Sequence, residues 1–141
     1  MPIAELAAHL RLAVARTARR LRQEATVGLS PSLNTALASV ERHGPLTPSE
    51  LAARERIQRP TATKLIAALE ERGLVARTAD PADRRSSLIA VTPAGAALLE
   101  EIRTRKDAFL AQRLRGLSAE DRATLARAAD LLEGLLEEER R

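Results

Sequence analysis

The sequence predicts a mainly helical fold with one small β-hairpin. Six segments place apolar residues at the three- and four-residue spacing of a helix that buries one face. Aromatic residues make up 1% of the chain, and Phe109 is the only one, so the core must be built from Leu, Ala, Ile and Val. Such a composition favours helices over sheets. Residues 74–92 depart from the helical period and contain two short β-compatible runs around a turn.

Length and composition limit the classes of protein to consider. With 141 residues, the chain suits a single domain with a real core. It has no cysteine, so disulfides, thiolate metal sites and thiol-based redox sensing are excluded. No apolar run resembles a signal peptide or reaches the length of a membrane span, and we therefore expect a cytoplasmic protein.

No arrangement of residues typical of an enzyme is visible. His9 and His43 are the only histidines, too few for a catalytic or metal centre, and we expect each to be a partly buried structural residue. The sequence lacks a phosphate-binding glycine-rich loop, a zinc signature and a supported Ser-His-Asp set. We expect neither catalysis nor a cofactor.

Residues that start and stop helices divide the helical segments. Ser30 and Thr92 each stand before a proline and can cap the helix that follows. Thr47 is followed three residues later by Glu50, which forms a capping box. The six helices expected from these signals run from Ile3 to about Val27, Pro31 to about His43, Pro48 to about Arg54, about Arg59 to Arg72, Pro93 to about Arg115, and onward from Ser118.

The segment between the fourth and fifth helices is predicted to form the hairpin. Its strands are expected at 74–79 and 88–92, where the apolar pattern suits short strands. Between them, the sequence DPADRR reads as a turn followed by an exposed tip.

Two short helices joined by a tight turn and followed at once by a hairpin form a winged helix-turn-helix. The second helix of such a pair is narrow enough to enter the major groove of DNA, while the first crosses the backbone. The edge of this second helix that faces the DNA should carry hydrogen-bonding side chains and cations. Its opposite face should be apolar. Ala62, Leu65, Ile66 and Leu69 supply the apolar face. The polar edge expected to contact DNA consists of Gln58, Arg59, Thr61, Thr63 and Lys64.

The hairpin tip carries the paired arginines Arg84 and Arg85. They suit insertion into a narrow, electronegative minor groove, and the alternative is a solubilising loop tip. Asp83 is expected to brace them, either by accepting hydrogen bonds from backbone N–H groups or by pairing with an arginine. The net charge of +4 is modest, but residues 54–85 contain eight basic and five acidic side chains, while the last nine residues lean acidic.

Three further residues are candidates for contacts to phosphate. Ser32 and Asn34 lie near the start of the second helix, where helix N-termini attract anions, and simple capping is the alternative for both. Arg77, on the first strand, is the third candidate.

The stretch LTPSELAARERIQRPTATKLIAALEERGLVAR, followed by DPADRR and then LIAVTPAGAALL, resembles the MarR family of bacterial transcriptional regulators. The most specific motif is Asp-Pro-x-Asp-Arg-Arg before an apolar strand that ends in Thr-Pro-x-Gly. The resemblance implies one MarR-like domain over 1–141, with a winged helix-turn-helix lobe at 30–92 and a helical dimerisation region at 1–27 and 93–141. It also implies an obligate homodimer that binds a pseudo-palindromic operator, usually as a repressor released by a small ligand.

The resemblance also places an effector pocket between the dimer helices and the DNA-binding lobe. Residues of the first two helices expected to line it are Leu12, Arg16, Val40 and His43.

Two positions depart from the family's pattern, because Arg56 and Gln58 stand where members often have a small residue and a Ser or Thr cap. Glutamine is a weaker cap, so Gln58 is expected to face a base or a phosphate instead.

Two other functions would use the same fold. A winged helix can serve as a protein-interaction module, but such a module has no need for paired arginines at the tip. A non-specific architectural DNA binder usually carries far more positive charge than +4 and gains nearly all its affinity from phosphates.

Overall fold

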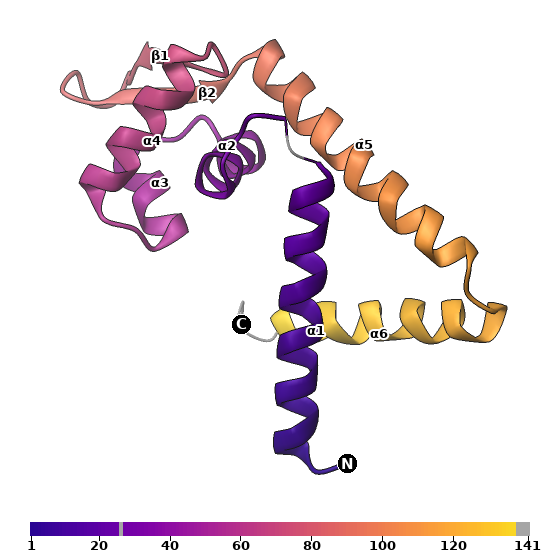
Figure 1. The fold of residues 1–141 in the computed structure, drawn as a ribbon. Helices are drawn as coiled ribbons and strands as arrows, with labels where there is room; N and C mark the ends of the chain where they lie inside the picture. The colour runs from indigo at the N-terminus through magenta and orange to yellow at the C-terminus, as the bar shows by residue number, and fades with distance from the viewer. Residues whose placement is uncertain (26, 138–141) are drawn as a thin grey trace. The chain divides into compact units, whose positions relative to one another are not determined.

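The computed structural model describes residues 1–25 and 27–137, which form six helices and one antiparallel hairpin (Figure 1). The mainly helical fold with a small hairpin is therefore confirmed. Thr26 and residues 138–141, the end of the acidic C-terminal segment, lie outside the described residues. The elements in chain order are α1 (Ile3–Glu24), α2 (Pro31–His43), α3 (Pro48–Glu55), α4 (Arg59–Glu71), β1 (Val75–Ala79), β2 (Ser87–Val91), α5 (Pro93–Arg115) and α6 (Ala119–Glu137).

The bounds agree with the expected ones to within a residue, except at the end of α1. This helix ends at Glu24, before the expected end near Val27. Ala25 ends it because its backbone leaves the helical region, with φ −114° and ψ 30°, although its N–H still donates to the Leu21 carbonyl. Gly28 follows at φ +77°, a left-handed conformation that costs glycine little.

Contacts between Cα atoms divide the chain into two compact units, Met1–Lys106 and Asp107–Arg141. The expected lobe at 30–92 lies wholly inside the first unit. The first unit extends to Lys106 because the first half of α5 is anchored in the core, where Leu99 is 2% and Ile102 4% exposed. The assignment of the flanking helices to a dimerisation region remains a prediction.

The predicted caps hold the helix starts. The Ser30 hydroxyl accepts a hydrogen bond from the backbone N–H of Leu33 at 3.3 Å. The Thr47 hydroxyl accepts from the N–H of Glu50 at 3.1 Å, and the Glu50 carboxylate accepts from the N–H of Thr47 at 3.5 Å, which completes the capping box. These bonds satisfy N–H groups that have no partner inside their own helix.

The core of the first unit is aliphatic, as the composition predicted. It joins α2, α3, α4, the hairpin and the start of α5, whereas α1 and α6 have no buried residue within their described bounds. Burying a Leu or Ile side chain contributes about 1.5–3 kcal/mol, so a core of this kind can hold the unit together without aromatic rings. The largest fully buried side chains are those of Leu37, Val40, Leu46, Leu51, Ile66, Leu69, Ile89 and Leu99.

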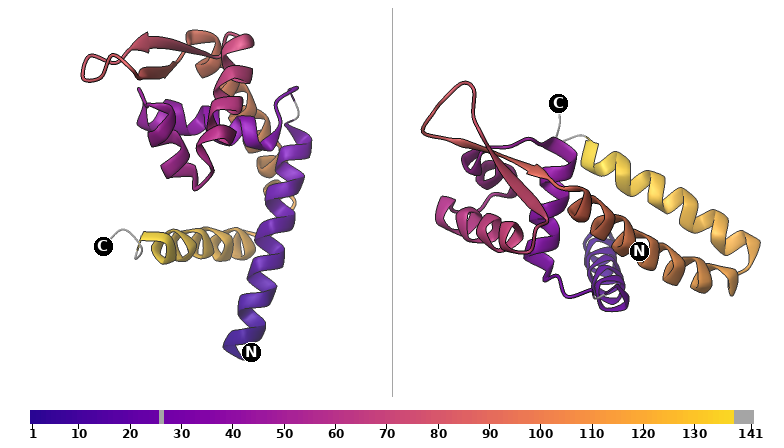
Figure 2. Two further views of the ribbon diagram at one scale, coloured as in Figure 1. Left: turned by 90° about the vertical axis from the view of Figure 1, so that its left-hand side faces the viewer. Right: turned by 90° about the horizontal axis from the view of Figure 1, so that it is seen from above.

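The hairpin pairs β1 with β2 in antiparallel register, with Val75 opposite Val91 and Arg77 opposite Ile89. Leu46, between α2 and α3, adds a short bridge to the free side of β2, because its N–H and carbonyl exchange hydrogen bonds with Ile89 at 3.0 and 2.7 Å. Beyond the strands, the loop of the hairpin extends away from the helices of the first unit (Figure 2). The base of the hairpin is thus anchored and its tip is exposed.

The hairpin joins α5 through a close contact at Thr92 and Gly95. The Thr92 hydroxyl donates to the Gly73 carbonyl at 2.6 Å and accepts from the N–H of Gly95 at 3.1 Å. A Cβ atom on Gly95 would lie 2.2 Å from the Leu74 carbonyl oxygen and 2.8 Å from a methyl of Val91. Only glycine allows the helix to approach the strands this closely.

The second unit consists of the end of α5 and α6. Within it, Arg122 of α6 is tied to the turn that follows α5, because its guanidinium donates to the Leu117 carbonyl at 2.9 Å. Most of the leucines of α6 are exposed, with Leu131 at 55%, Leu135 at 63% and Leu136 at 68%. Of the helices in the described residues, none combines the length and apolar composition needed to span a bilayer.

We expect Gly95→Ala to destabilise the protein by roughly 1–3 kcal/mol, because the added methyl group must push strand backbone away from α5. Gly116→Ala is the matched control, since its Cβ would lie 3.5 Å from the Arg113 carbonyl oxygen, an ordinary contact. Denaturant unfolding of both variants measures the difference. Equal midpoints for the two variants would contradict the close contact at Gly95.

Candidate nucleic-acid interface

The turn between α3 and α4 is tight and internally bonded. Arg56 adopts φ 53°, a left-handed conformation unusual for a residue with a side chain. The N–H groups of Arg56 and Ile57 donate to the carbonyls of Ala53 and Ala52, at 3.3 and 3.0 Å. These bonds end α3 and fix the direction in which α4 begins. An arginine in a left-handed conformation thus stands where the family resemblance led us to expect a small residue.

Helix α4 separates its apolar and polar faces as expected. Ala62, Ile66 and Leu69 are 0% exposed and pack into the core, and Leu65 is half-buried. Because these positions fix the rotation of the helix, the opposite edge faces solvent. All five side chains predicted for that edge are exposed: Gln58, Arg59, Thr61, Thr63 and Lys64.

The exposed edge contains both tethered and free side chains. The Arg59 guanidinium donates to the Ser49 hydroxyl on α3, and the Thr63 hydroxyl donates to the Arg59 carbonyl at 3.0 Å. Gln58 occupies the cap position of α4 but makes no side-chain capping bond. Lys64 forms no salt bridge with another described residue. The edge therefore presents one positioned cation, Arg59, beside side chains that are free to meet a ligand.

The hairpin loop is held by its two aspartates. The Asp80 carboxylate accepts from the N–H of Ala82, and the Asp83 carboxylate accepts from the N–H of Arg85, each at 2.9 Å. Backbone bonds from Asp83 N–H to the Asp80 carbonyl and from Ser86 N–H to the Asp83 carbonyl complete two successive turns. The loop conformation is thus set by local side-chain bonds of the kind aspartate forms in turns.

Arg84 and Arg85 lie at the exposed tip of this loop. The Arg85 side chain is 95% exposed, and its Nε lies 3.7 Å from the Asp83 carboxylate. Asp83 therefore does both things expected of it, accepting a backbone hydrogen bond and facing an arginine. An ion pair this exposed contributes little to stability.

Arg77 links the hairpin to α4. Its Nε donates to both carboxylate oxygens of Glu70, at 3.1 and 3.2 Å, and its Nη1 donates to the Ser87 hydroxyl at 3.3 Å. One side chain thereby joins α4, β1 and β2. Ser49 and Glu70, the partners of Arg59 and Arg77, were not identified from the sequence, since they lie ten and seven residues from the arginines they bind.

Ser32 and Asn34 occupy the first turn of α2, with Ser32 exposed and Asn34 half-buried. Neither caps the helix with its side chain, because that role falls to Ser30. Capping, one of the two alternatives for these residues, is therefore wrong, and the contact to phosphate remains a prediction.

The four residues expected to line an effector pocket are not brought together. Val40 is 1% exposed and belongs to the core, because it lies on the inner face of α2. Leu12 and Arg16 are exposed on α1, and His43 is exposed at the end of α2. His9 is also exposed, so the expectation that both histidines are partly buried is wrong. The sequence alone does not define which sides of these two helices face each other.

Comparisons with known proteins agree with this geometry. The MarR family model matches residues 29–87. An uncharacterised HTH-type transcriptional regulator of Mycobacterium bovis is 39% identical over 136 residues, which cover 96% of this chain and 95% of the relative. The HTH-type transcriptional repressor MdtR of Bacillus subtilis is 33% identical over 110 residues, covering 73% of this chain and 71% of that protein.

Solved structures show the same fold. A putative transcriptional regulator from Pseudomonas aeruginosa superposes with a TM-score of 0.86 at 36% identity, over 94% of each chain. A point mutant of MepR from S. aureus, solved bound to an oligodeoxyribonucleotide, has a TM-score of 0.72 at 22% identity over 92% of this chain and 97% of that one, a likeness of fold alone. Together with the family match, these relatives show that the chain belongs to the MarR family of DNA-binding, winged helix-turn-helix transcriptional regulators, and not to a family of enzymes.

Proposed function

We propose that this regulator is a homodimeric repressor that recognises a pseudo-palindromic operator and is released from it by a small molecule. The observation that carries the proposal is the pairing of an exposed polar edge on α4 with two arginines at the tip of an anchored hairpin. A helix edge and a basic hairpin tip suit the major groove and the neighbouring minor groove respectively.

In this proposal, α4 reads sequence through the edge from Gln58 to Lys64. Gln58 and Lys64 suit hydrogen bonds to base edges, which amides and ammonium groups form in the major groove. Arg59, tied to Ser49, suits a phosphate contact that fixes the register of the helix. Thr61 and Thr63 offer small hydroxyl groups that allow close approach to the bases.

The hairpin tip supplies the second contact. Arg84 and Arg85 carry guanidinium groups that a narrow minor groove attracts through its negative potential. The two aspartate-stabilised turns hold the loop in one shape before DNA binds, so less conformational entropy is lost on binding.

The exposed apolar side chains of α1 and α6 support a homodimer. Ile3 is 87% and Val14 50% exposed on α1, and three leucines of α6 are more than half exposed. A second copy of the chain would remove this surface from water and, by two-fold symmetry, would present two reading helices to two half-sites. The repressor role is supported by the relative MdtR, which is named a repressor.

Replacing Arg84 or Arg85 with Ala should weaken binding to a DNA site selected from a random pool by roughly 1–3 kcal/mol, provided that the arginine makes a good contact with the groove. Arg105→Ala, on α5, is the control for the loss of one positive charge outside the interface. Fluorescence anisotropy with labelled DNA measures the affinities. If the arginine variants bind as tightly as the control, the hairpin tip does not contact DNA.

A homodimer should protect two half-sites about 10 base pairs apart, centre to centre, because its two reading helices meet successive turns of the major groove. Hydroxyl-radical footprinting on the selected DNA tests this spacing. Protection of a single half-site would rule out the symmetric dimer on DNA.

Variants of Arg77 and Glu70 distinguish two roles for Arg77. If the bridge positions the hairpin, Arg77→Ala and Glu70→Ala should weaken DNA binding to a similar extent, since each breaks it. If Arg77 instead binds phosphate, Arg77→Ala should weaken binding and lower the salt slope by about 1, whereas Glu70→Ala should leave affinity equal or higher. Affinities measured across a salt series separate the outcomes.

A further inference from the structure

One side-chain hydrogen bond joins the two helices of the helix-turn-helix at their exposed side. Ser49 is the second residue of α3 and Arg59 is the first residue of α4. The Nη1 group of Arg59 donates to the Ser49 hydroxyl, and both side chains are exposed. Neither side chain forms another hydrogen bond or a salt bridge with a described residue. The bond therefore ends at the polar edge of α4 without taking part in any larger network of described residues.

Both ends of this bond are placed by the core. Pro48, directly before Ser49, is buried, and Leu51, two residues after it, is completely buried. Ala62, one turn after Arg59, is completely buried as well. Because packing fixes the rotation of each helix, the Ser49 hydroxyl is an acceptor at a fixed position beside the start of α4.

The partner of Arg59 is neutral, unlike the partner of Arg77. The Glu70 carboxylate offsets the positive charge of Arg77 in a salt bridge of 3.1 Å. The Ser49 hydroxyl carries no charge, and a guanidinium has several N–H donors, of which this bond uses one. Ser49 thus restricts the direction of the Arg59 guanidinium while leaving its charge and its remaining donors available for an anion.

A restricted direction matters when the arginine binds a phosphate of DNA. A free arginine side chain samples many rotamers and loses that freedom on binding, which weakens the complex. When the side chain is already held in the bound direction, less freedom is lost. A phosphate contact of fixed direction also fixes where the helix stands along the duplex.

We propose that Ser49 is a positioning residue for DNA recognition, whose hydroxyl holds the Arg59 guanidinium toward one phosphate of the operator and so sets the register of α4 in the major groove. This inference rests on the proposed function, because it requires α4 to be the reading helix. Ser49 acts through Arg59 and makes no contact with DNA itself. On DNA of unrelated sequence α4 has no preferred register, so the tether gives no advantage there.

The first experiment is a double-mutant cycle on the full chain, with DNA selected from a random pool and affinities measured by fluorescence anisotropy. Ser49→Ala should weaken binding about three- to tenfold, the range that corresponds to immobilising one side chain. Arg59→Gln should weaken it about tenfold or more, because a charged hydrogen bond is lost. Once Arg59 is replaced, Ser49→Ala should have no further effect.

Two results of this cycle overturn the proposal. An equal loss from Ser49→Ala in the presence and absence of Arg59 shows that Ser49 contacts DNA directly. No loss from Ser49→Ala in the otherwise unchanged protein shows that the bond does not position Arg59 for binding.

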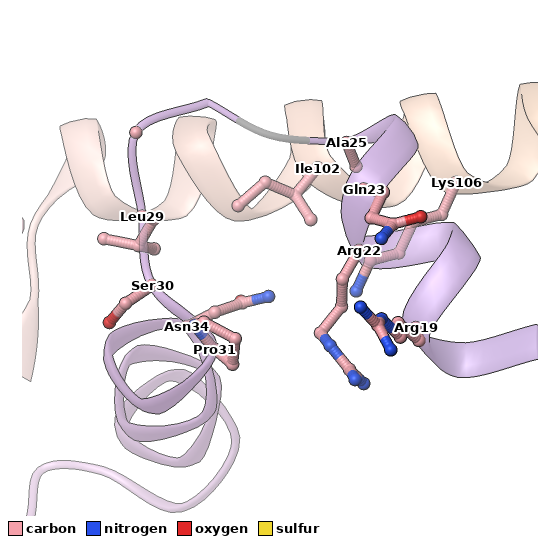
Figure 3. A pocket seen from close by; sticks show the side chains of 11 residues that line it. Arg19, Arg22, Gln23, Ala25, Leu29, Ser30, Pro31, Asn34, Ile102 and Lys106 are labelled. Atoms are coloured by element: carbon pink, nitrogen blue, oxygen red, sulfur yellow. The ribbon is translucent and has the colours of Figure 1, made fainter. Parts of the chain in front are cut away.

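Ser49→Thr and Lys106→Gln are the controls. Ser49→Thr keeps the hydroxyl and should bind DNA as the unchanged protein does, and a loss as large as that of Ser49→Ala overturns the role of the hydroxyl. Lys106→Gln removes one positive charge elsewhere in the first unit. Lys106 and Arg19 line a cavity of about 540 Å³ bounded by α1, the first turn of α2 and α5, and no residue of α4 lines it (Figure 3). Thermal unfolding followed by circular dichroism verifies that every variant folds.

DNA of unrelated sequence tests the effect on register. Ser49→Ala should bind such DNA as tightly as the unchanged protein does, so its preference for the selected DNA falls by the factor found in the cycle. A structural role in the fold would weaken binding to both kinds of DNA alike. Equal losses on both therefore overturn the proposal.

The same measurements separate failure of this inference from failure of the proposed function. If Arg84→Ala and Arg59→Gln weaken binding to selected DNA while Ser49→Ala does not, the interface stands and the positioning role of Ser49 falls. If Arg59→Gln binds as tightly as Lys106→Gln, the phosphate contact of Arg59 in the proposed function falls, and the role of Ser49 falls with it.

Discussion

The geometry of the interface depends on the burial of one face of α4. Ala62, Ile66 and Leu69 are withdrawn completely from solvent by α2, α3 and the start of the hairpin. Three side chains at helical spacing leave a rigid helix no freedom to rotate about its axis without exposing apolar surface, at a cost of about 1.5–3 kcal/mol for each large side chain. The direction of the polar edge is therefore set by the core, and the polar residues themselves need not hold the helix in place. Substitutions on that edge can therefore change which DNA sequence is recognised while the fold is kept.

The hairpin achieves its position in two separate ways. Its tip is shaped locally, by two aspartates that accept hydrogen bonds from backbone two residues further along. Its base is placed by long-range contacts: the exchange of hydrogen bonds between Leu46 and Ile89, the Arg77 bridge to Glu70, and the close approach of Gly95 to Leu74. The local bonds decide what the tip presents, and the long-range contacts decide where it is presented relative to α4. Both are needed if a helix and a loop are to meet adjacent grooves of the same DNA.

Some cations of the first unit bond to a side chain of a neighbouring element, and others do not. Arg103 on α5 bonds to Glu41 on α2, and that hydrogen bond raises the pKa of Arg103 from its ordinary value. Arg77 and Arg59 are likewise tied to named partners. In contrast, Lys64, Arg19 and Lys106 have no acidic partner among the described residues. Lys64 lies on the α4 edge, where DNA is proposed to bind, whereas Arg19 and Lys106 line the cavity between α1, α2 and α5.

The sequence by itself determined the helices, their caps, the hairpin and the polar edge of α4, because each is encoded by spacing over a few residues: Thr47 to Glu50, Asp83 to Arg85, and Ala62 to Ile66 to Leu69. Tertiary structure alone decided the partners of Arg59 and Arg77, the requirement for glycine at position 95, and the cavity lined by Arg19 and Lys106. The burial of Val40 in the core was decided in the same way, since the sequence shows that α2 is amphipathic but not which helix its inner face meets. Local hydrogen bonds and periodicity depend on neighbours in the chain, whereas the contacts between helices depend on crossing angles and rotations that only the packed core fixes.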